Sequence, residues 1–418
     1  MISAILALSQ VTATPIHHHD DWRSELPPQV LDLIAQQEQT STTGEPPATD
    51  KEQEKAKKDQ ERHKRDIEND IKEGKEIAEL VEKELKLSQD KDAEAKLQAI
   101  GAELAEIANQ APVDVTWGDG RFNQFQYQFK LLEGDDVNAF SLPGGYIFFY
   151  DGLIKFAESD DEIAAVVAHE ISHAAFRHMA TLRREQAKMS WAALPAILAA
   201  AFSRNPEVIS GTLTAASLTN QAFASGWSVD AEKSADYGAV QYMVKSRYNA
   251  VGMLTFMERL AFRDRFAPKI DWGIYASHPP SEQRASSIMK QLAKYDIPVK
   301  RSAVTTTYSA RSIPQENGNY ELWFGNTKVY SFGGAEAKER AALAVITLNN
   351  YLDTLPASYT VQTSGKELLG RGRVMFTGRA EDVIGRQISP EEAIRDARSA
   401  LSHVIFDLSF RVWASPRG

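Results

Sequence analysis

Apolar residues at helical spacing predict a helix near the middle of the chain. They recur three or four positions apart, as on one face of a helix, and they are Ile163, Val167, Ile171 and Ala174. Ser159 and Glu162 precede this stripe in the pattern of a capping box, and the residues between them are acidic, as in many first helical turns. We therefore expect a helix that starts directly after Ser159.

A helix and two strands are predicted ahead of this element. The helix is indicated by a narrow apolar stripe, at which we expect the folded domain to begin: Leu97, Ile100, Leu104 and Ile107. Aromatic residues are frequent in Gln126–Leu132 and Tyr146–Tyr150, which predicts strands, and Pro143-Gly144-Gly145 predicts a turn before the second. The residues preceding this turn could form an exposed sheet edge that pairs with an extended peptide, or the segment could be an ordinary hairpin.

Beyond about residue 301 the pattern changes to strands followed by helices. Glu321–Phe332 predicts a hairpin that turns at Gly325-Asn326, and Ala335–Leu355 predicts the helix after it. Strands at 359–362 and 371–377 and a helix at 390–410 then repeat this order loosely. We expect residues 301–418 to form a small α+β module that binds substrate or a partner protein, or that serves as a structural lid.

The chain before the first apolar stripe divides into three segments. Residues 1–13 are apolar and end in a small-x-small sequence, which fits a secretory signal or a disordered terminus. Residues 14–50 predict a disordered leader and linker, and the histidines at 17–19 are given no role. Residues 51–96 are rich in Lys and Glu and predict a charged helical arm, either solvated or available to a partner.

Composition limits the class of protein. The 418 residues are 43% hydrophobic, enough for a buried core, and the net charge of -10 argues against nucleic acid as a partner. No cysteine is present, so any metal must be held by His, Asp or Glu. Residues 189–202 are the longest apolar candidate, but Pro195 interrupts them, which predicts a buried helix or a peripheral membrane contact rather than a span.

The predicted central helix carries His169-Glu170-Ile171-Ser172-His173. Two histidines four residues apart project from one helix face, where their imidazoles can hold one zinc ion. Glu170 is turned about one hundred degrees from His169, so it can reach a metal-activated water without being a ligand. This spacing predicts a zinc hydrolase with Glu170 as general base.

The remaining candidate site residues are spread over three later segments. Glu232 and Asp236 lie four apart at the start of a predicted helix, so Glu232 can be the third ligand while Asp236 accepts the spare N–H of a ligand histidine. His178 is five residues beyond His173, which is off the ligand face and predicts a structural or supporting role. His278 and Arg284 could each donate to the oxyanion of a tetrahedral intermediate.

Four motifs in this order resemble the forty-eighth metallopeptidase family, which includes the CAAX prenyl endopeptidase, HtpX and periplasmic assembly proteases of Gram-negative bacteria. The motifs are Asn138-Ala139-Phe140 with Pro143-Gly144-Gly145, His169-Glu170-Ile171-Ser172-His173 with His178, Glu232-x-x-x-Asp236, and Ser277-His278-Pro279 with Arg284. The resemblance implies a mainly helical, zincin-like α+β domain at 97–300 with a small sheet beside the cleft. It implies one Zn²⁺ held by His169, His173 and Glu232, and a substrate bordered by Asn138 and Ala139.

The chain lacks the multiple spans of the membrane-embedded members and looks more like the soluble, envelope-localised branch. We therefore expect a periplasmic or otherwise extracytoplasmic endopeptidase, in which Phe140 continues the substrate-binding stretch. Its expected partners are unfolded or misassembled proteins, with an envelope protein bound through 301–418. The resemblance also implies that His278 could approach the zinc and make the enzyme latent. The alternative is a chaperone-like or latent zinc-binding scaffold that acts mainly by binding proteins.

Overall fold

The computed structural model describes residues 50–110, 112–185, 229–264 and 282–412. The chain divides into two units, Met1–Lys64 and Arg65–Gly418, and every described residue with an expected functional role belongs to the second. The helices and small sheets confirm the α+β class. The expected signal at 1–13, the leader at 14–49 and the membrane-contact segment at 189–202 lie outside the described residues.

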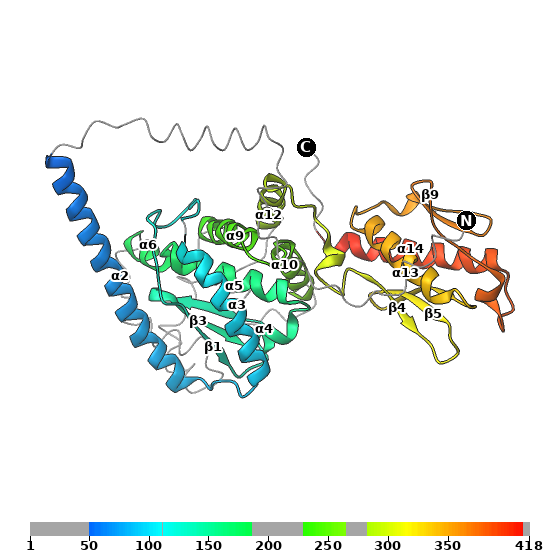
Figure 1. Ribbon diagram of the computed structural model, residues 1–418, viewed down its shortest axis with the longest axis horizontal. Coiled ribbons are helices and arrows are strands. Elements are labelled where there is room, and N and C mark those ends of the chain that lie inside the picture. Colours follow the sequence, from blue (N-terminus) through cyan, green and yellow to red (C-terminus); the bar gives the residue numbers. More distant parts are fainter. Residues whose placement is uncertain (1–49, 111, 186–228, 265–281, 413–418) are drawn as a thin grey trace, which may run out of the picture. The chain divides into compact units, whose positions relative to one another are not determined.

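A three-stranded sheet lies beside the central helix (Figure 1). Its strands are β1 (Gln128–Leu132), β2 (Ala139–Leu142) and β3 (Tyr146–Tyr150), in the order β1-β3-β2. β1 is parallel to β3, whereas β2 is antiparallel to it and pairs Ala139 with Phe149. The turn η2 (Pro143–Gly145) joins β2 to β3, and Gly144 and Gly145 have φ of 76° and 90°, which glycine adopts without strain. β2 is thus both a hairpin strand and the edge of this sheet.

Helices cover one face of the sheet and enclose the central helix α5 (Asp160–Ala175). The other helices of this layer are α3 (Lys91–Gln110), α4 (Asp151–Phe156), α9 (Val229–Val244), α10 (Val251–Asp264) and α12 (Glu282–Lys294). The short helix α6 (His178–Glu185) follows α5 and places Met179 in the cluster on the other face of the sheet. α5 starts as expected, because the Ser159 hydroxyl accepts a hydrogen bond from the Glu162 amide. Every residue from Glu162 to Ala175 is buried, because α5 packs between the sheet and the surrounding helices.

The second half of the charged arm packs against the opposite face of the sheet. Residues 50–84 form one helix, α2 (Asp50–Glu84), and Ile77, Ala78 and Val81 share a buried cluster with Phe140 and Phe148. Part of the charged arm thus packs into a buried cluster with the sheet, ahead of the expected domain start at residue 97. The apolar stripe of α2 is short and contains small residues. The helix packs on the sheet because it buries aromatic side chains of the strands, which the composition of α2 alone does not reveal.

Residues beyond Lys300 form two similar halves around one hydrophobic core. The first half contains β4 (Ala310–Pro314), β5 (Tyr320–Phe324), β6 (Thr327–Phe332) and α13 (Ala337–Leu352). The second contains β7 (Val361–Ser364), β8 (Glu367–Gly370), β9 (Arg373–Thr377) and α14 (Pro390–Arg411). Each half is an antiparallel three-stranded meander followed by a helix. β4 and β8 are additional to the expected strands, and both contain residues that are unusual in strands, Pro314 and Gly370.

Buried polar contacts attach this C-terminal module to the helical layer. The Arg301 guanidinium binds both carboxylate oxygens of Glu258, at 2.8 and 2.7 Å. Glu158, just ahead of α5, accepts hydrogen bonds from the hydroxyls of Thr305 and Thr307 and from the Thr307 amide. The C-terminal linker, residues 301–307 between α12 and β4, is therefore fixed to the start of the central helix. Within the described part of the chain, no helix has the length and apolar character needed to cross a membrane.

Candidate metal centre

Two histidines of α5 and one carboxylate of α9 converge on a single point. The ligand atoms of His169, His173 and Glu232 all lie within 4.8 Å of one another, and the three side chains are buried. The two Nε2 atoms are 3.0 Å apart, and each is 3.4 Å from a Glu232 carboxylate oxygen. Spacing along α5 explains the histidine pair, and close packing of α9 on α5 brings Glu232 opposite it.

These donors fit a zinc ion. Two neutral imidazoles and one carboxylate form a common zinc ligand set that leaves one coordination position open. The centre is buried and contains no thiolate, because the chain has no cysteine. Glu170 follows His169 on α5 and is also fully buried. Burial would lower the pKa of Arg284, but Asp236, Glu232 and, less strongly, Glu170 raise it. A carboxylate is thus available beside the three candidate ligands.

Asp236 and Arg284 stand behind the ligands. Asp236 Oδ1 lies 3.0 Å from Nδ1 of His169, one helical turn after Glu232 on α9. Arg284 donates from Nε and Nη2 to the two Asp236 oxygens, at 2.7 Å each, and its Nη1 is 3.0 Å from Glu232. Three guanidinium nitrogens are therefore engaged by carboxylates. This geometry favours a role of Arg284 in positioning Glu232 and Asp236, and its expected oxyanion role stays a prediction.

The charges of this cluster shift the pKa values of its members. Burial alone would lower the pKa of His169, but Asp236 and Glu232 raise it to about 9. Burial lowers the pKa of His173 well below its usual value, despite Glu232. Burial would raise the pKa of Asp236, but Arg284 holds it below its usual range. Metal binding at this point requires release of the proton from His169.

His178 lies behind His173, on the side away from Glu232. Its Nδ1 is 2.8 Å from Nδ1 of His173, and its Nε2 is 3.0 Å from the Trp117 carbonyl oxygen. The sequence identified His178 as a supporting residue but did not identify Trp117, which belongs to the segment between α3 and β1. Trp117 acts through its main chain, so its side-chain type gave no signal.

The expected substrate-binding stretch lies at the edge strand β2. Ala139 is buried in the cluster that includes α5, whereas Phe140 stacks on Phe148 at 5.2 Å in the cluster on the opposite face. The Phe140 side chain is thus part of the core, which leaves the main chain of β2 as the candidate contact for a peptide. Asn138 is buried, and within the described residues its Oδ1 has no hydrogen-bond partner.

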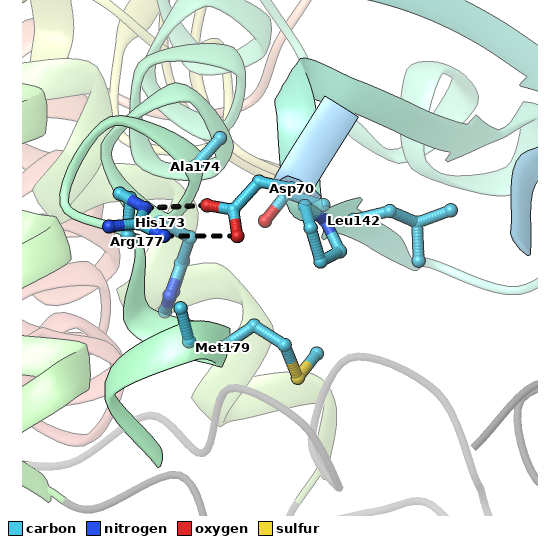
Figure 2. Close-up of a pocket in the computed structure, with 9 residues that line it drawn as sticks. Asp70, Leu142, His173, Ala174, Arg177 and Met179 are labelled. Atoms are coloured by element: carbon cyan, nitrogen blue, oxygen red, sulfur yellow. Dashed lines mark hydrogen bonds and ion pairs between the residues drawn. The ribbon is translucent and has the colours of Figure 1, made fainter. Parts of the chain in front are cut away.

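A water-sized cavity of about 10 Å³ adjoins His173 (Figure 2). The side chains around it come from α2, β2, η2, α5 and α6, and they include Asp70, Leu142, Ala174 and Met179. Arg177 closes one end, where its Nε and Nη2 bind the two Asp70 oxygens at 2.5 and 3.1 Å. His278, expected near the metal, lies in residues 265–281, outside the described part of the chain.

The stretch that carries this centre is similar to a known protein family. Residues 92–292 match Peptidase family M48, and all three candidate ligands lie within this stretch. The similarity to this family therefore covers the stretch that holds the candidate metal centre. Residues 51–91 of the charged arm and the C-terminal module lie outside the matched residues.

Three proteins illustrate the similarity. The beta-barrel assembly-enhancing protease of Escherichia coli is 32% identical over 162 residues, covering 38% of this chain and 33% of that protein. The mitochondrial metalloendopeptidase OMA1 of Saccharomyces cerevisiae is 27% identical over 210 residues, covering 48% of this chain and 56% of that protein. The metalloprotease YcaL of Escherichia coli is 26% identical over 208 residues, covering 48% of this chain and 72% of that protein. The match spans about a third of the beta-barrel assembly-enhancing protease.

Proposed function

Because a stretch similar to Peptidase family M48 holds His169, His173 and Glu232 around one point, we propose that this protein is a zinc-dependent endopeptidase. The observation that carries this proposal is the position of Glu170, a buried carboxylate directly after a candidate ligand on the same helix. The similarity to proteins named as metalloproteases supports the same reaction class.

Each residue of the proposed metal centre has its own role in the reaction. His169, His173 and Glu232 would hold zinc, which supplies a Lewis acid that makes water nucleophilic near neutral pH. Glu170 takes a proton from the attacking water and delivers it to the nitrogen of the leaving amine. Arg284 holds Glu232 and Asp236 in place, and Asp236 orients His169.

The proposed substrates are unfolded or misassembled proteins. β2 is an edge strand next to α5, so an extended segment could pair with its main chain close to Glu170. Such pairing selects an extended backbone rather than a fixed sequence, and folded domains seldom expose one. The name of the relative from Escherichia coli, a beta-barrel assembly-enhancing protease, supports a role in envelope protein quality control. We accordingly place the enzyme outside the cytoplasm.

The test is cleavage of casein by the purified chain loaded with zinc. We expect the wild type to cut casein and Glu170→Gln to lose at least about 10²-fold in rate, because general base catalysis contributes about 10²–10⁴-fold. Zinc content is measured in both samples, and both should hold one equivalent. Glu76→Gln, at an exposed position of α2, is the matched control and should cut normally.

Two results would contradict the proposal. Equal cleavage by the wild type and zinc-loaded Glu170→Gln would exclude Glu170 as the base. Absence of cleavage by a zinc-loaded wild type that still binds unfolded casein would favour the chaperone-like or latent scaffold. His278→Ala distinguishes a latent enzyme from a chaperone-like scaffold, since it should restore cleavage only in the latent enzyme.

A further inference from the structure

The two candidate ligand histidines have different partners on their outer nitrogens. His169 faces the carboxylate of Asp236 at 3.0 Å, whereas His173 faces another imidazole, that of His178, at 2.8 Å. A histidine ligand usually donates its second N–H to an acceptor that fixes its tautomer and orientation. An imidazole can accept that bond only in one of its two neutral tautomers. The arrangement behind His173 therefore depends on what fixes the tautomer of His178.

The Trp117 carbonyl oxygen fixes it. That oxygen lies 3.0 Å from Nε2 of His178 and can only accept, so Nε2 of His178 must carry the proton. In the neutral ring, Nδ1 of His178 is then an acceptor, and Nδ1 of His173 must be the donor in the bond between them. His173 thereby keeps an unprotonated Nε2, which is the nitrogen that faces Glu232.

Trp117 is itself held by α9, the helix that supplies Glu232. The Ser234 hydroxyl accepts from the Trp117 amide at 3.0 Å and donates to the Trp117 carbonyl at 2.9 Å. Ser234 is two residues after Glu232 and is fully buried. The same helix therefore carries the third ligand and fixes the main chain that selects the tautomer of His178.

Packing around the next residue shows that this close approach is built into the segment. Gly118 has φ of 117°, and a Cβ there would lie 2.6 Å from the Phe176 carbonyl oxygen and 2.8 Å from Cδ2 of His178. The Asp119 amide donates to that same Phe176 carbonyl at 2.7 Å, which caps the end of α5. The His178 ring is fully buried and lies 5.1 Å from the Trp117 ring, between centroids.

We propose that His178 is the positioning residue of His173, and that Trp117 and Ser234 set its tautomer through the main chain. This inference rests on the metal centre proposed above and adds the residues that prepare His173 to bind. The chain of bonds runs from Ser234 to the Trp117 carbonyl, to His178, and to Nδ1 of His173. It leaves Nε2 of His173 free of a proton and aimed at the metal position.

Two variants of equal size separate positioning from packing. In His178→Asn, the amide oxygen takes the place of Nδ1 and can still accept from His173, whereas His178→Leu has the same shape and no acceptor. We expect zinc affinity, measured by competition with a chromogenic chelator, to fall by about 10- to 100-fold in His178→Leu. His178→Asn should stay several-fold closer to the wild type. Equal affinities for all three proteins, or equal losses in both variants, would overturn the proposal.

A spectroscopic measurement tests the bond directly. In zinc-loaded wild type labelled with ¹⁵N-histidine, a hydrogen bond between the Nδ1 atoms of His173 and His178 should give a scalar coupling between the two nitrogens. Observation of Nδ1 of His173 without a proton would overturn the assignment, even if neither His178 variant folds. Ser234→Ala should weaken the coupling, because the Trp117 carbonyl loses one of its anchors.

The outcome is independent of peptide cleavage. Glu170→Gln should retain the nitrogen–nitrogen coupling and zinc affinity of the wild type, because Glu170 takes no part in these bonds. If casein is not cut but the coupling is present and His178→Leu loses zinc, the endopeptidase proposal fails and the positioning proposal stands. If casein is cut and zinc affinity is unchanged in His178→Leu, the reverse holds.

Discussion

Gly74 of α2 lies against the main chain of Pro143, at the turn between β2 and β3. A Cβ on Gly74 would be 1.8 Å from the Pro143 carbonyl oxygen, so no flexible side chain can yield to relieve the contact. α2 thereby packs against the turn η2, which follows the edge strand β2. Residues 65–84 of α2 should consequently be treated as part of the folded domain, although the family match begins at residue 92.

Gly74→Ala tests this contact between α2 and the main chain of Pro143. Alanine is favoured over glycine in a helix by roughly 1 kcal/mol, yet overpacking against fixed backbone typically costs about 1–3 kcal/mol. We expect a net loss in the free energy of unfolding, measured with urea. Lys75→Ala, on the exposed face of the same helix, should change it by less than about 0.5 kcal/mol. Stabilisation by Gly74→Ala would show that α2 does not pack there.

Arg284→Met tests the role of the buried guanidinium. Removing it leaves Asp236 and Glu232 as buried carboxylates without their cation, which typically costs about 3–5 kcal/mol. Zinc should recover part of this loss, because it would supply positive charge beside Glu232. Arg247→Met breaks the exposed pair with Glu103 and should cost less than about 1 kcal/mol. Similar unfolding free energies for the two variants would exclude the positioning role of Arg284.

Local spacing made the central part of the site predictable from sequence. His169, Glu170 and His173 follow from one helical period, and Glu232 with Asp236 follows from a second. The hairpin at Gly325-Asn326 was predicted for a similar reason, since its turn residues lie between alternating apolar positions. In each case the interaction depends on side-chain type and on neighbours within one turn or one strand pair.

Other features depend on contacts between residues that are far apart in the sequence, and composition does not reveal such contacts. Trp117 acts through its carbonyl oxygen, and Ser234 meets it across 117 positions of sequence. Arg284 was located in its motif, but its role followed only from the positions of two carboxylates on α9. The packing of α2 was missed because its buried face combines Gly74 and Ala78 with few large apolar residues.

Acid should weaken the contact between the C-terminal linker and the start of α5. Burial would raise the pKa of Glu158, but hydrogen bonds from Thr305 and Thr307 lower it from 4.5 to about 2. Because the folded-state pKa is the lower one, this stabilisation is complete above pH 4.5 and is lost as the pH falls through about 2.

Glu158→Gln isolates that contribution. At pH 6 we expect the free energy of unfolding of the variant to be about 1.5–3 kcal/mol lower than that of the wild type, the range for hydrogen bonds to a charged group. The difference between the two proteins should shrink steadily between pH 4.5 and pH 2. A difference that stays constant across this range would mean that ionised Glu158 does not hold the linker.

Zinc should stabilise the folded chain through Glu232. A ligand that binds only the folded state adds about 2.7 kcal/mol when its free concentration is 100 times its Kd. We expect the wild type, stripped with a chelator and then given zinc, to regain this stability in a urea titration. Glu232→Gln keeps the shape of the side chain but removes its charge, so its gain at the same zinc concentration should be much smaller. Glu282→Gln, an exposed acid at the start of α12, should respond like the wild type. An equal response of Glu232→Gln would remove Glu232 from the ligand set.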